Sequence, residues 1–321
     1  MDSVEINLGL ACNCRCLYCP SMPEPERRFA PRDEVVAEIE RAASRGIEEI
    51  SFSGGEPTAF PDFESLVARC RNLGCAVGIS TNGLLLEDAD RLAALIDAGL
   101  TRVGISFNGS DAAMEDRIAG QAGAFGRKQA ALDNLLRVQD RLPGGLKVKW
   151  VLHRKLLSGL EAAIEGMHRR GVPVQGFNLI RPVPEMGSGL AAYVPRVEEL
   201  RRAIRRAAAC NELEWHANFA FLDVPPCCFP WEVLADGELE RRYRGHAYER
   251  EITQFYEQGP QRAPWRTERI STLKSKAAAC RDCRLNGSCE GIWNGYLALF
   301  GEREFDTAPA FVEACLSGGR A

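Results

Sequence analysis

The feature that most constrains the fold is a strand-then-helix pattern that repeats through roughly the first 180 residues. Apolar residues alternate over 4–10, as in a half-buried strand, and recur at helical spacing over 31–45. The same reasoning predicts strands at 49–52, 76–80, 102–107, 147–153 and 174–179, and helices at 61–72, 88–98, 127–141 and 159–170. Strands and helices that alternate at this spacing imply parallel strands with right-handed crossovers. We therefore expect an α/β fold, either a doubly wound sheet or a partial (β/α)6 barrel of the TIM type.

The unusual residues of this region come directly after the expected strands. Parallel sheets place their ligand sites at the carboxyl ends of the strands. At these ends the sequence has a cysteine-rich run, a Gly-Gly-Glu-Pro segment and several small polar residues; they lie at 12–19, 54–57, 80–83 and 106–108. The sequence therefore predicts a functional site on this edge of the sheet.

Length and charge narrow the class of protein further. The chain has 321 residues, enough for about two domains, and the strand–helix pattern stops near residue 210. We expect a core domain over 1–209 and a smaller domain over 210–321. The net charge of −4 disfavours a nucleic-acid partner. The sequence has neither a long apolar run nor a signal peptide, so we expect a cytoplasmic protein with no membrane segment.

Cysteine is the abnormal residue type. The chain has 13 cysteines, and an odd number without an export signal indicates metal binding or catalysis rather than disulfides. Cys12, Cys16 and Cys19 have the spacing C-x3-C-x2-C, and thiolates are ligands for iron–sulfur clusters or zinc. Three thiolates on a four-iron cluster would leave one iron open, which is typical of a catalytic site. A zinc site that also uses Cys14 is the alternative.

This motif resembles that of the radical S-adenosylmethionine (SAM) enzymes. Tyr18 occupies the aromatic position of C-x3-C-x-aromatic-C, directly after the first strand, and the Gly-Gly-Glu-Pro segment follows the second. The resemblance covers about residues 4–205 in motif order. It implies that Cys12, Cys16 and Cys19 hold a [4Fe–4S] cluster and that SAM chelates the open iron. Reductive cleavage would then yield methionine and a 5′-deoxyadenosyl radical.

The resemblance also implies a set of SAM-binding residues. Small glycines would let backbone carbonyls approach the SAM ammonium, and Glu56 would orient it. The other side chains would contact the methionyl, ribose or carboxylate groups, although ordinary turns are the alternative for these segments. The full set is Tyr18, Gly54, Gly55, Glu56, Pro57, Ser80, Asn82, Ser106 and Asn108. The sequence identifies no catalytic residue.

A second group of cysteines lies in the C-terminal region. Cys227 and Cys228 are adjacent, and Cys280, Cys283 and Cys289 follow; four of these thiolates would saturate a cubane cluster. The run after Cys289 resembles the auxiliary-cluster tail known as twitch or SPASM, in the shorter form that binds one cluster. We expect a second, auxiliary [4Fe–4S] cluster on Cys227, Cys280, Cys283 and Cys289. The choice between Cys227 and Cys228 stays open, and structural zinc is the alternative.

The resemblance implies an oxidoreductase or maturase that abstracts a substrate hydrogen. The tail favours oxidative modification of a ribosomal precursor peptide. Because the first strand begins at residue 4, we expect peptide recognition to need a separate protein, and an electron donor such as flavodoxin or ferredoxin is implied as well. The alternative is the same chemistry on a small metabolite, such as an amino acid, sugar or nucleotide. A non-catalytic iron–sulfur carrier is disfavoured because it would not need the Gly-Gly-Glu-Pro segment.

Overall fold

A computed structural model describes residues 3–19, 27–183, 188–245 and 249–317. The chain divides into two compact units. The first unit comprises Met1–Lys149 and Tyr248–Thr267, and the second comprises Trp150–Ala247 and Glu268–Ala321. No helix in the described ranges combines the length and the hydropathy that a membrane crossing requires.

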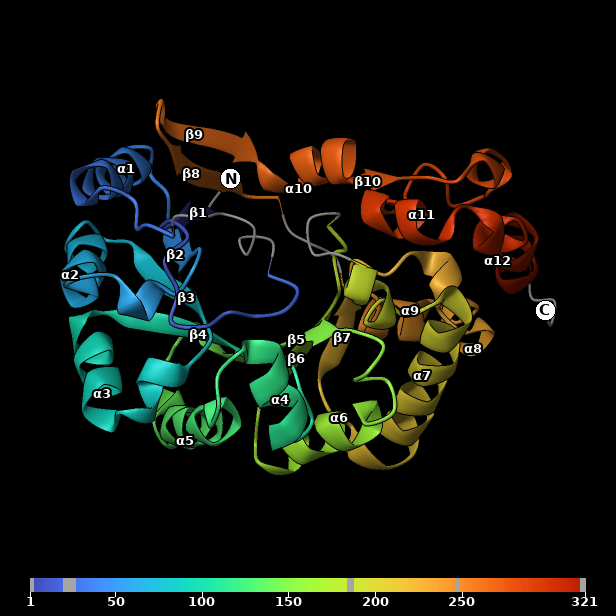
Figure 1. Cartoon of the computed structure of the whole chain (residues 1–321), viewed down its shortest axis with the longest axis horizontal. Coiled ribbons are helices and arrows are strands. Elements are labelled where there is room, and N and C mark those ends of the chain that lie inside the picture. Colours follow the sequence, from blue (N-terminus) through green and yellow to red (C-terminus); the bar gives the residue numbers. More distant parts are fainter. Residues whose placement is uncertain (1–2, 20–26, 184–187, 246–248, 318–321) are drawn as a thin grey trace. The chain divides into compact units, whose positions relative to one another are not determined.

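The first unit is built on parallel strands with helices outside them (Figure 1). Its strands lie in the order β4-β3-β2-β1-β8-β9, and only β9 runs antiparallel to its neighbour. The strands are β1 (Ser3–Asn7), β2 (Glu49–Ser53), β3 (Ala76–Thr81), β4 (Leu100–Phe107), β8 (Glu251–Tyr256) and β9 (Gly259–Pro264). The helices are α1 (Arg32–Ser44), η1 (Pro57–Ala59), α2 (Phe63–Asn72), η2 (Leu84–Glu87), α3 (Ala89–Ala98), α4 (Ala112–Ala119), α5 (Ala124–Arg137) and η3 (Gln139–Arg141).

Alternation and capping explain these elements. Val4 and Ile6 of β1 are almost fully buried and alternate with the half-buried Glu5 and Asn7, as the two faces of a strand require. Two of the helices begin at an aspartate that accepts hydrogen bonds from backbone N–H groups of the first turn, Asp88 before α3 and Asp111 before α4, which satisfies donors that have no partner within the helix.

The second unit continues the parallel pattern and adds a cysteine-containing tail. Strand β5 (Gly145–Leu152) crosses the boundary between the units, and β6 (Val174–Leu179) pairs in parallel with β7 (Phe219–Leu222). The helices before the tail are α6 (Leu160–Arg169), η5 (Ser188–Ala192), α7 (Val197–Cys210), η6 (Asn211–Trp215), η7 (Pro226–Cys228), α8 (Trp231–Leu234) and α9 (Gly237–Tyr243). The tail contains η8 (Arg269–Leu273), β10 (Lys274–Ser275), η9 (Ala278–Asp282), β11 (Ile292–Trp293), α11 (Asn294–Phe300), η10 (Arg303–Phe305) and α12 (Ala308–Leu316), and α10 (Trp265–Glu268) precedes it.

The elements expected up to residue 179 are present within a few residues of the predicted ends. The prediction that the strand–helix pattern stops near residue 210 was wrong, because two further parallel strands follow. Strand β7 extends the parallel pairing of β6, and β8 pairs in parallel with β1. Strand β7 has only four residues, and the apolar residues of β8, EITQFY, do not alternate, so neither strand has a clear signal in the sequence. The compact units are divided by contacts in space, and the predicted domain boundary at 209/210 stays a prediction.

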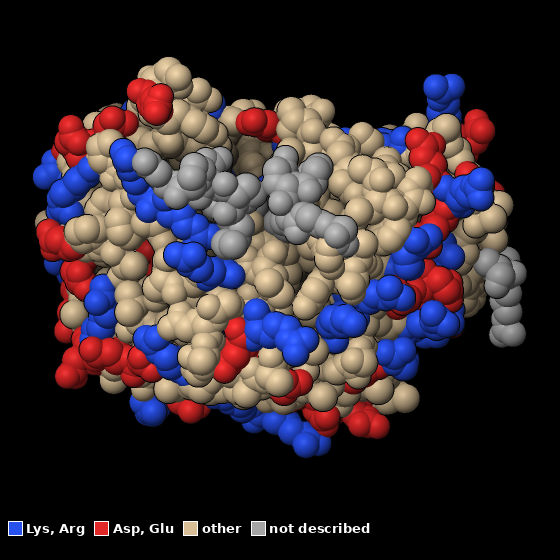
Figure 2. All heavy atoms as spheres, in the orientation of Figure 1, with Lys and Arg blue, Asp and Glu red and all other residues tan. Residues whose placement is uncertain are grey.

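On the face shown in Figure 2, Lys and Arg side chains gather over α7 and the segment that leads into α6.

Candidate active site

The loop that carries Cys12, Cys16 and Cys19 follows β1 and is held by the end of α4. The N–H of Arg15 donates to the carbonyl of Ala119 at 2.9 Å, and that of Leu17 donates to Ile118 at 2.9 Å. The loop also folds on itself, because the N–H of Cys19 donates to the carbonyl of Cys16 at 3.1 Å. These backbone bonds fix the loop independently of any bound group.

Gly54 and Gly55 let the loop after β2 lie directly against the cysteine loop. A Cβ on Gly55 would lie 2.0 Å from the carbonyl oxygen of Ala11, and one on Gly54, whose φ is +121°, would lie 2.5 Å from that of Gly9. The N–H of Gly55 donates to Gly9 and the N–H of Glu56 to Ala11, both at 2.8 Å. The glycines are therefore required by contact between the two loops, a reason that the sequence analysis did not foresee.

Glu56 joins the ends of β2 and β3. Its side chain is 1% exposed. One carboxylate oxygen accepts hydrogen bonds from the N–H and hydroxyl of Thr58 and from the hydroxyl of Thr81, at 3.0, 2.6 and 2.6 Å. The other accepts from the N–H of Asn82 at 2.7 Å. The carboxylate therefore positions the residue that follows β3.

Asn82 in turn points at the cysteine loop. Its Nδ2 lies 2.6 Å from Oδ1 of Asn13 and 3.7 Å from Sγ of Cys12. Its Oδ1 accepts from the N–H of Leu84 at 2.9 Å, which holds the amide in this orientation. Three predicted site residues, Glu56, Asn82 and Cys12, are thus linked in one chain of contacts.

The cysteine loop separates its thiols by environment. Cys14 is 2% exposed and packs with Leu84, Ala119 and Ala124 in a small apolar cluster, against whose surface Cys12 and Cys16 lie. Hydrogen bonds from the Cys14 side chain lower the pKa of Cys12 to about 7 and also lower the pKa of Cys16. The same hydrogen bonds raise the pKa of Cys14. Cys14 thus differs in environment from its two neighbours, and its backbone N–H lies 3.4 Å from Sγ of Cys12.

A buried ion pair lies behind the end of β4. Nζ of Lys128 is 2.7 Å from a carboxylate oxygen of Glu115 and donates to the carbonyl of Ser106 at 2.9 Å. Glu115 also accepts from the N–H groups of Asn108 and Gly109 at 2.6 and 2.8 Å. The positive charge of Lys128 contributes to the lowered pKa of Cys16. Sequence reasoning missed this pair, which positions the predicted residues Ser106 and Asn108.

The remaining predicted SAM-binding residues lie at neighbouring strand ends. Pro57 begins the 3-10 turn after Glu56, and Tyr18 is 7% exposed. The hydroxyl of Ser80 accepts a hydrogen bond at 2.9 Å from Nζ of Lys149. Burial lowers the pKa of Lys149 to about 8. Lys149 is a second residue near the site that the sequence analysis did not single out.

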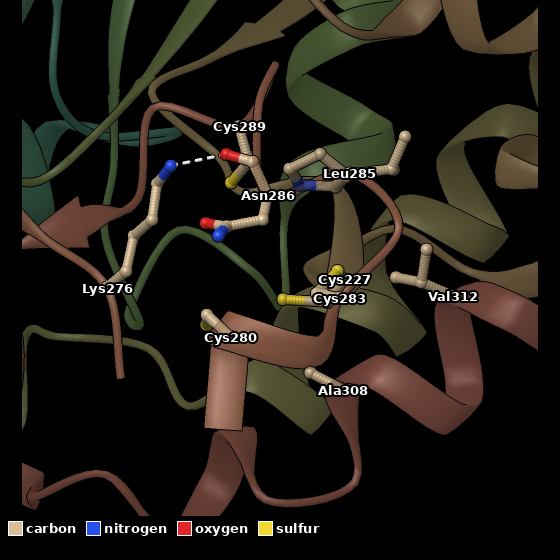
Figure 3. Close-up of a pocket in the computed structure, with 10 residues that line it drawn as sticks. Cys227, Lys276, Cys280, Cys283, Leu285, Asn286, Cys289, Ala308 and Val312 are labelled. Carbon is tan, nitrogen blue, oxygen red and sulfur yellow. Dashed lines mark hydrogen bonds between the residues drawn. The ribbon is translucent and has the colours of Figure 1, made fainter. Parts of the chain in front are cut away.

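In the second unit, four cysteines line one small pocket (Figure 3). They are Cys227, Cys280, Cys283 and Cys289, and the pocket is completed by apolar residues and by Lys276, whose Nζ donates to the carbonyl of Asn286. Cys228 is fully buried and is absent from the lining. A hydrogen bond from the Cys228 side chain lowers the pKa of Cys227 and raises that of Cys228.

The chain around this pocket is held by charged side chains. Arg201 donates to the carbonyl of Cys227 at 2.8 Å and lies over the ring of Phe311. Glu290, next to Cys289, pairs with Lys274 at 2.9 Å and Arg269 at 3.0 Å. These contacts fix the backbone on two sides of the pocket.

Within the described residues, no group of three or more His, Cys, Asp and Glu side chains is arranged to hold a metal ion. In a four-iron cluster each thiolate binds a different iron, so its cysteines need not converge on one point. The metal-ligand and SAM-binding assignments remain predictions.

Comparison with known proteins identifies the family of the N-terminal region, which carries Cys12, Cys16 and Cys19. Residues 6–147 match the family model of the Radical SAM superfamily. The PqqA peptide cyclase of Rhodopseudomonas palustris is 39% identical over 165 residues, which are 51% of this chain and 42% of the relative. That of Granulibacter bethesdensis is 31% identical over 223 residues, 66% of this chain and 58% of the relative. The chain thus spans less than two thirds of the length of either relative.

Solved structures show a likeness of fold. SuiB of Streptococcus suis, bound to S-adenosylmethionine, has a TM-score of 0.62 at 16% identity, over 92% of this chain and 74% of SuiB. The anSMEcpe structure with AdoMet and the Kp18Cys peptide has a TM-score of 0.64 at 12% identity, over 98% and 99% of the two chains. The predicted α/β fold on parallel strands, of the partial-barrel class, is confirmed.

The chain therefore carries a radical SAM domain over residues 6–147. Domains of this superfamily belong to enzymes that use a [4Fe–4S] cluster and SAM. The prediction of an enzyme with these cofactors is confirmed at the level of this domain.

Proposed function

We propose that this chain is a radical SAM enzyme that abstracts a hydrogen atom from a residue of a ribosomal precursor peptide. The observation that carries the proposal is the arrangement of the cysteine loop, in which Cys14 is buried in an apolar cluster while Cys12 and Cys16 lie at its surface and Asn82 points at Cys12. Partly exposed thiols on a loop held by backbone hydrogen bonds suit a cluster that has three protein ligands. The donor chemistry of the loop therefore fits the cofactor of this domain.

We assign Cys12, Cys16 and Cys19 as the ligands of the first [4Fe–4S] cluster. A cluster held by these residues would supply the electron for cleavage of SAM to methionine and a 5′-deoxyadenosyl radical. Asn82 would keep its amide beside Cys12, where a hydrogen bond stabilises negative charge on sulfur. Cys14 is not assigned as a ligand, because its side chain is buried in the apolar cluster.

We assign the SAM site to the strand ends around this loop. The contributing residues are Tyr18, Gly54, Gly55, Glu56, Pro57, Ser80, Asn82, Ser106 and Asn108. Their backbone is held in place by Glu56 on one side and by the Lys128–Glu115 pair on the other. Rigid supporting contacts of this kind are what a reactive intermediate requires.

We assign an auxiliary [4Fe–4S] cluster to Cys227, Cys280, Cys283 and Cys289, in a twitch-like domain over 210–321. Support comes from the single pocket that these four cysteines line and from the exclusion of Cys228 from its lining. Four thiolates saturate such a cluster. A saturated cluster can accept an electron from a substrate radical, which would make the net reaction an oxidation.

The substrate class rests on the relatives. The names of the sequence relatives describe cyclases of the PqqA peptide, and one SuiB structure is described as bound to the precursor peptide SuiA, at 15% identity to this chain and a TM-score of 0.62. By analogy we propose a precursor peptide as the substrate. An electron donor such as flavodoxin or ferredoxin and a separate peptide-recognition protein complete the proposed system.

Anaerobic incubation of reconstituted protein with SAM and dithionite tests this function. We expect release of 5′-deoxyadenosine, and we expect the release to be abolished in Cys12→Ala, Cys16→Ala and Cys19→Ala. The matched control is Cys14→Ala, which should retain the cluster and the activity. Loss of the cluster in Cys14→Ala together with its retention in Cys12→Ala would refute the ligand assignment.

A further inference from the structure

A basic groove lies on the second unit, away from the pocket of cysteines. Its volume is about 640 Å³, within the range of about 300–1,000 Å³ that is common for ligand sites. One wall comes from the segment before α6 and the other from α7. The lining residues are Arg154, Lys155, Leu157, Ser158, Ala192, Glu199, Arg202, Ala203 and Arg206.

More basic side chains than carboxylates line the groove. Arg154 is paired with Glu199 at 2.7 Å, and Arg206 is paired with Glu161. Lys155 and Arg202 are exposed, and neither has an ion-pair partner among the residues that the structure describes. Within the part of the chain that the structure describes, these two cations therefore line the groove without an ion-pair partner, and Glu199, the one carboxylate in the described lining, pairs with Arg154.

This charge is local, because the whole chain has a net charge of −4. Arg202 and Arg206 belong to an arginine-rich run of α7 that would be expected, on sequence alone, to be an ordinary solvated helix face. In the structure, Lys155 and Arg154 from another segment face the same groove, and basic side chains gather over this region in Figure 2. Two separate segments thus contribute to one cationic surface.

The residues that line the groove narrow the class of ligand. Leu157 and Ala203 are 7% and 2% exposed, so they add little accessible surface, and the charged side chains are what a ligand would meet. Among the described lining residues none is aromatic, whereas single-stranded nucleic acids are bound by stacking of their bases on aromatic side chains. A groove lined by Arg154, Lys155, Arg202 and Arg206 suits an extended peptide that carries carboxylates.

We propose that this groove binds an acidic segment of the precursor peptide. This inference rests on the proposed function, and it adds a contact between this chain and the peptide to the recognition that the separate protein provides. Charge reversal at Lys155 and Arg202 should weaken binding, because each change removes an attraction and adds a repulsion.

The test measures fluorescence anisotropy of a fluorescein-labelled synthetic peptide of about twelve residues, in which glutamate alternates with alanine and leucine. The full-length protein should bind this peptide, and the double variant K155E/R202E should bind it about tenfold more weakly or worse. The matched control is R241E/R303E, which makes the same change of charge at two exposed arginines outside the groove. Circular dichroism establishes that both variants fold.

Three results would overturn the proposal. The first is that K155E/R202E binds the peptide as tightly as the wild type. The second is that R241E/R303E weakens peptide binding as much as K155E/R202E does. The third is that the protein binds a single-stranded oligonucleotide more tightly than the peptide and that K155E/R202E abolishes this binding. Release of 5′-deoxyadenosine without peptide is measured in parallel and does not depend on the groove. Failure of the proposed function and failure of this inference are therefore distinguishable.

Discussion

Replacing Lys128 with methionine removes one partner of an ion pair that is almost fully buried. The side chains of Lys128 and Glu115 are 1% and 0% exposed, and the charged atoms are 2.7 Å apart. The carboxylate of Glu115 would keep the N–H donors of Asn108 and Gly109 but would lose its only cationic partner recorded in the described structure. Leaving such a charge buried and unpaired costs about 3–5 kcal/mol.

The assay is the thermal unfolding of the apo-protein, followed by circular dichroism. For a domain of this size, 1 kcal/mol shifts Tm by about 2–4 °C, so we expect Lys128→Met to lower Tm by about 10 °C. The matched control is Lys155→Met at an exposed lysine, which should leave Tm within about 2 °C of the wild type. The double variant K128M/E115Q should recover part of the loss, because the neutral amide oxygen can still accept from the two backbone N–H groups. A Tm for Lys128→Met within about 2 °C of the wild type would refute the reasoning.

Three further predictions concern the two cysteine sites and the pH dependence of stability. Gly55→Ala should displace the cysteine loop and lower the iron content after reconstitution, since the new Cβ would lie 2.0 Å from the carbonyl oxygen of Ala11. The control Gly126→Ala, whose Cβ meets no atom within 4 Å, should keep the iron content of the wild type. Cys227→Ser should lose about four of about eight irons per chain, and Cys228→Ser should retain all of them, as measured by iron analysis. Loss of iron in Cys228→Ser with retention in Cys227→Ser would contradict the ligand assignment. Burial lowers the pKa of Lys149 to about 8, so the unfolded state binds this proton more tightly. Urea denaturation should therefore show the free energy of unfolding, relative to Lys149→Met, rising from about pH 8 to about pH 10.5, and a flat difference would contradict the stated burial.

Local periodicity predicted most of the strands and helices. Strand β6 lies at 174–179, as expected, because the buried Phe177 and Leu179 alternate with the half-buried Asn178, and Pro173 and Pro182 flank the strand. Strands β7 and β8 were missed because their own sequences carry little periodicity: β7 has four residues, FAFL, and the apolar residues of β8, EITQFY, do not alternate. The pairing of β8 with the N-terminal β1 also joins segments about 250 residues apart, as Val4 with Glu251, which no local window contains.

The candidate site, like the fold, was predicted only in part from the sequence. The cysteine spacing and the Gly-Gly-Glu-Pro segment were visible as motifs, but the reason for Gly55 was not, because it depends on how closely two loops approach. Spacing also could not separate Cys227 from Cys228, since adjacent residues differ only in the direction of their side chains. The Lys128–Glu115 pair did leave a signal: Lys128 shares the buried face of α5 with Ala124 and Ala131, and Glu115 shares that of α4 with Ile118.

The central claim is that three cysteines hold a cluster with one iron free to bind SAM. Electron paramagnetic resonance of the dithionite-reduced protein tests it most directly, in a variant with Cys280 and Cys283 replaced by alanine so that the first cluster is observed alone. The account predicts a reduced [4Fe–4S] signal whose g-values shift when SAM is added. A signal that SAM leaves unchanged, or a reconstituted centre without iron, would contradict it.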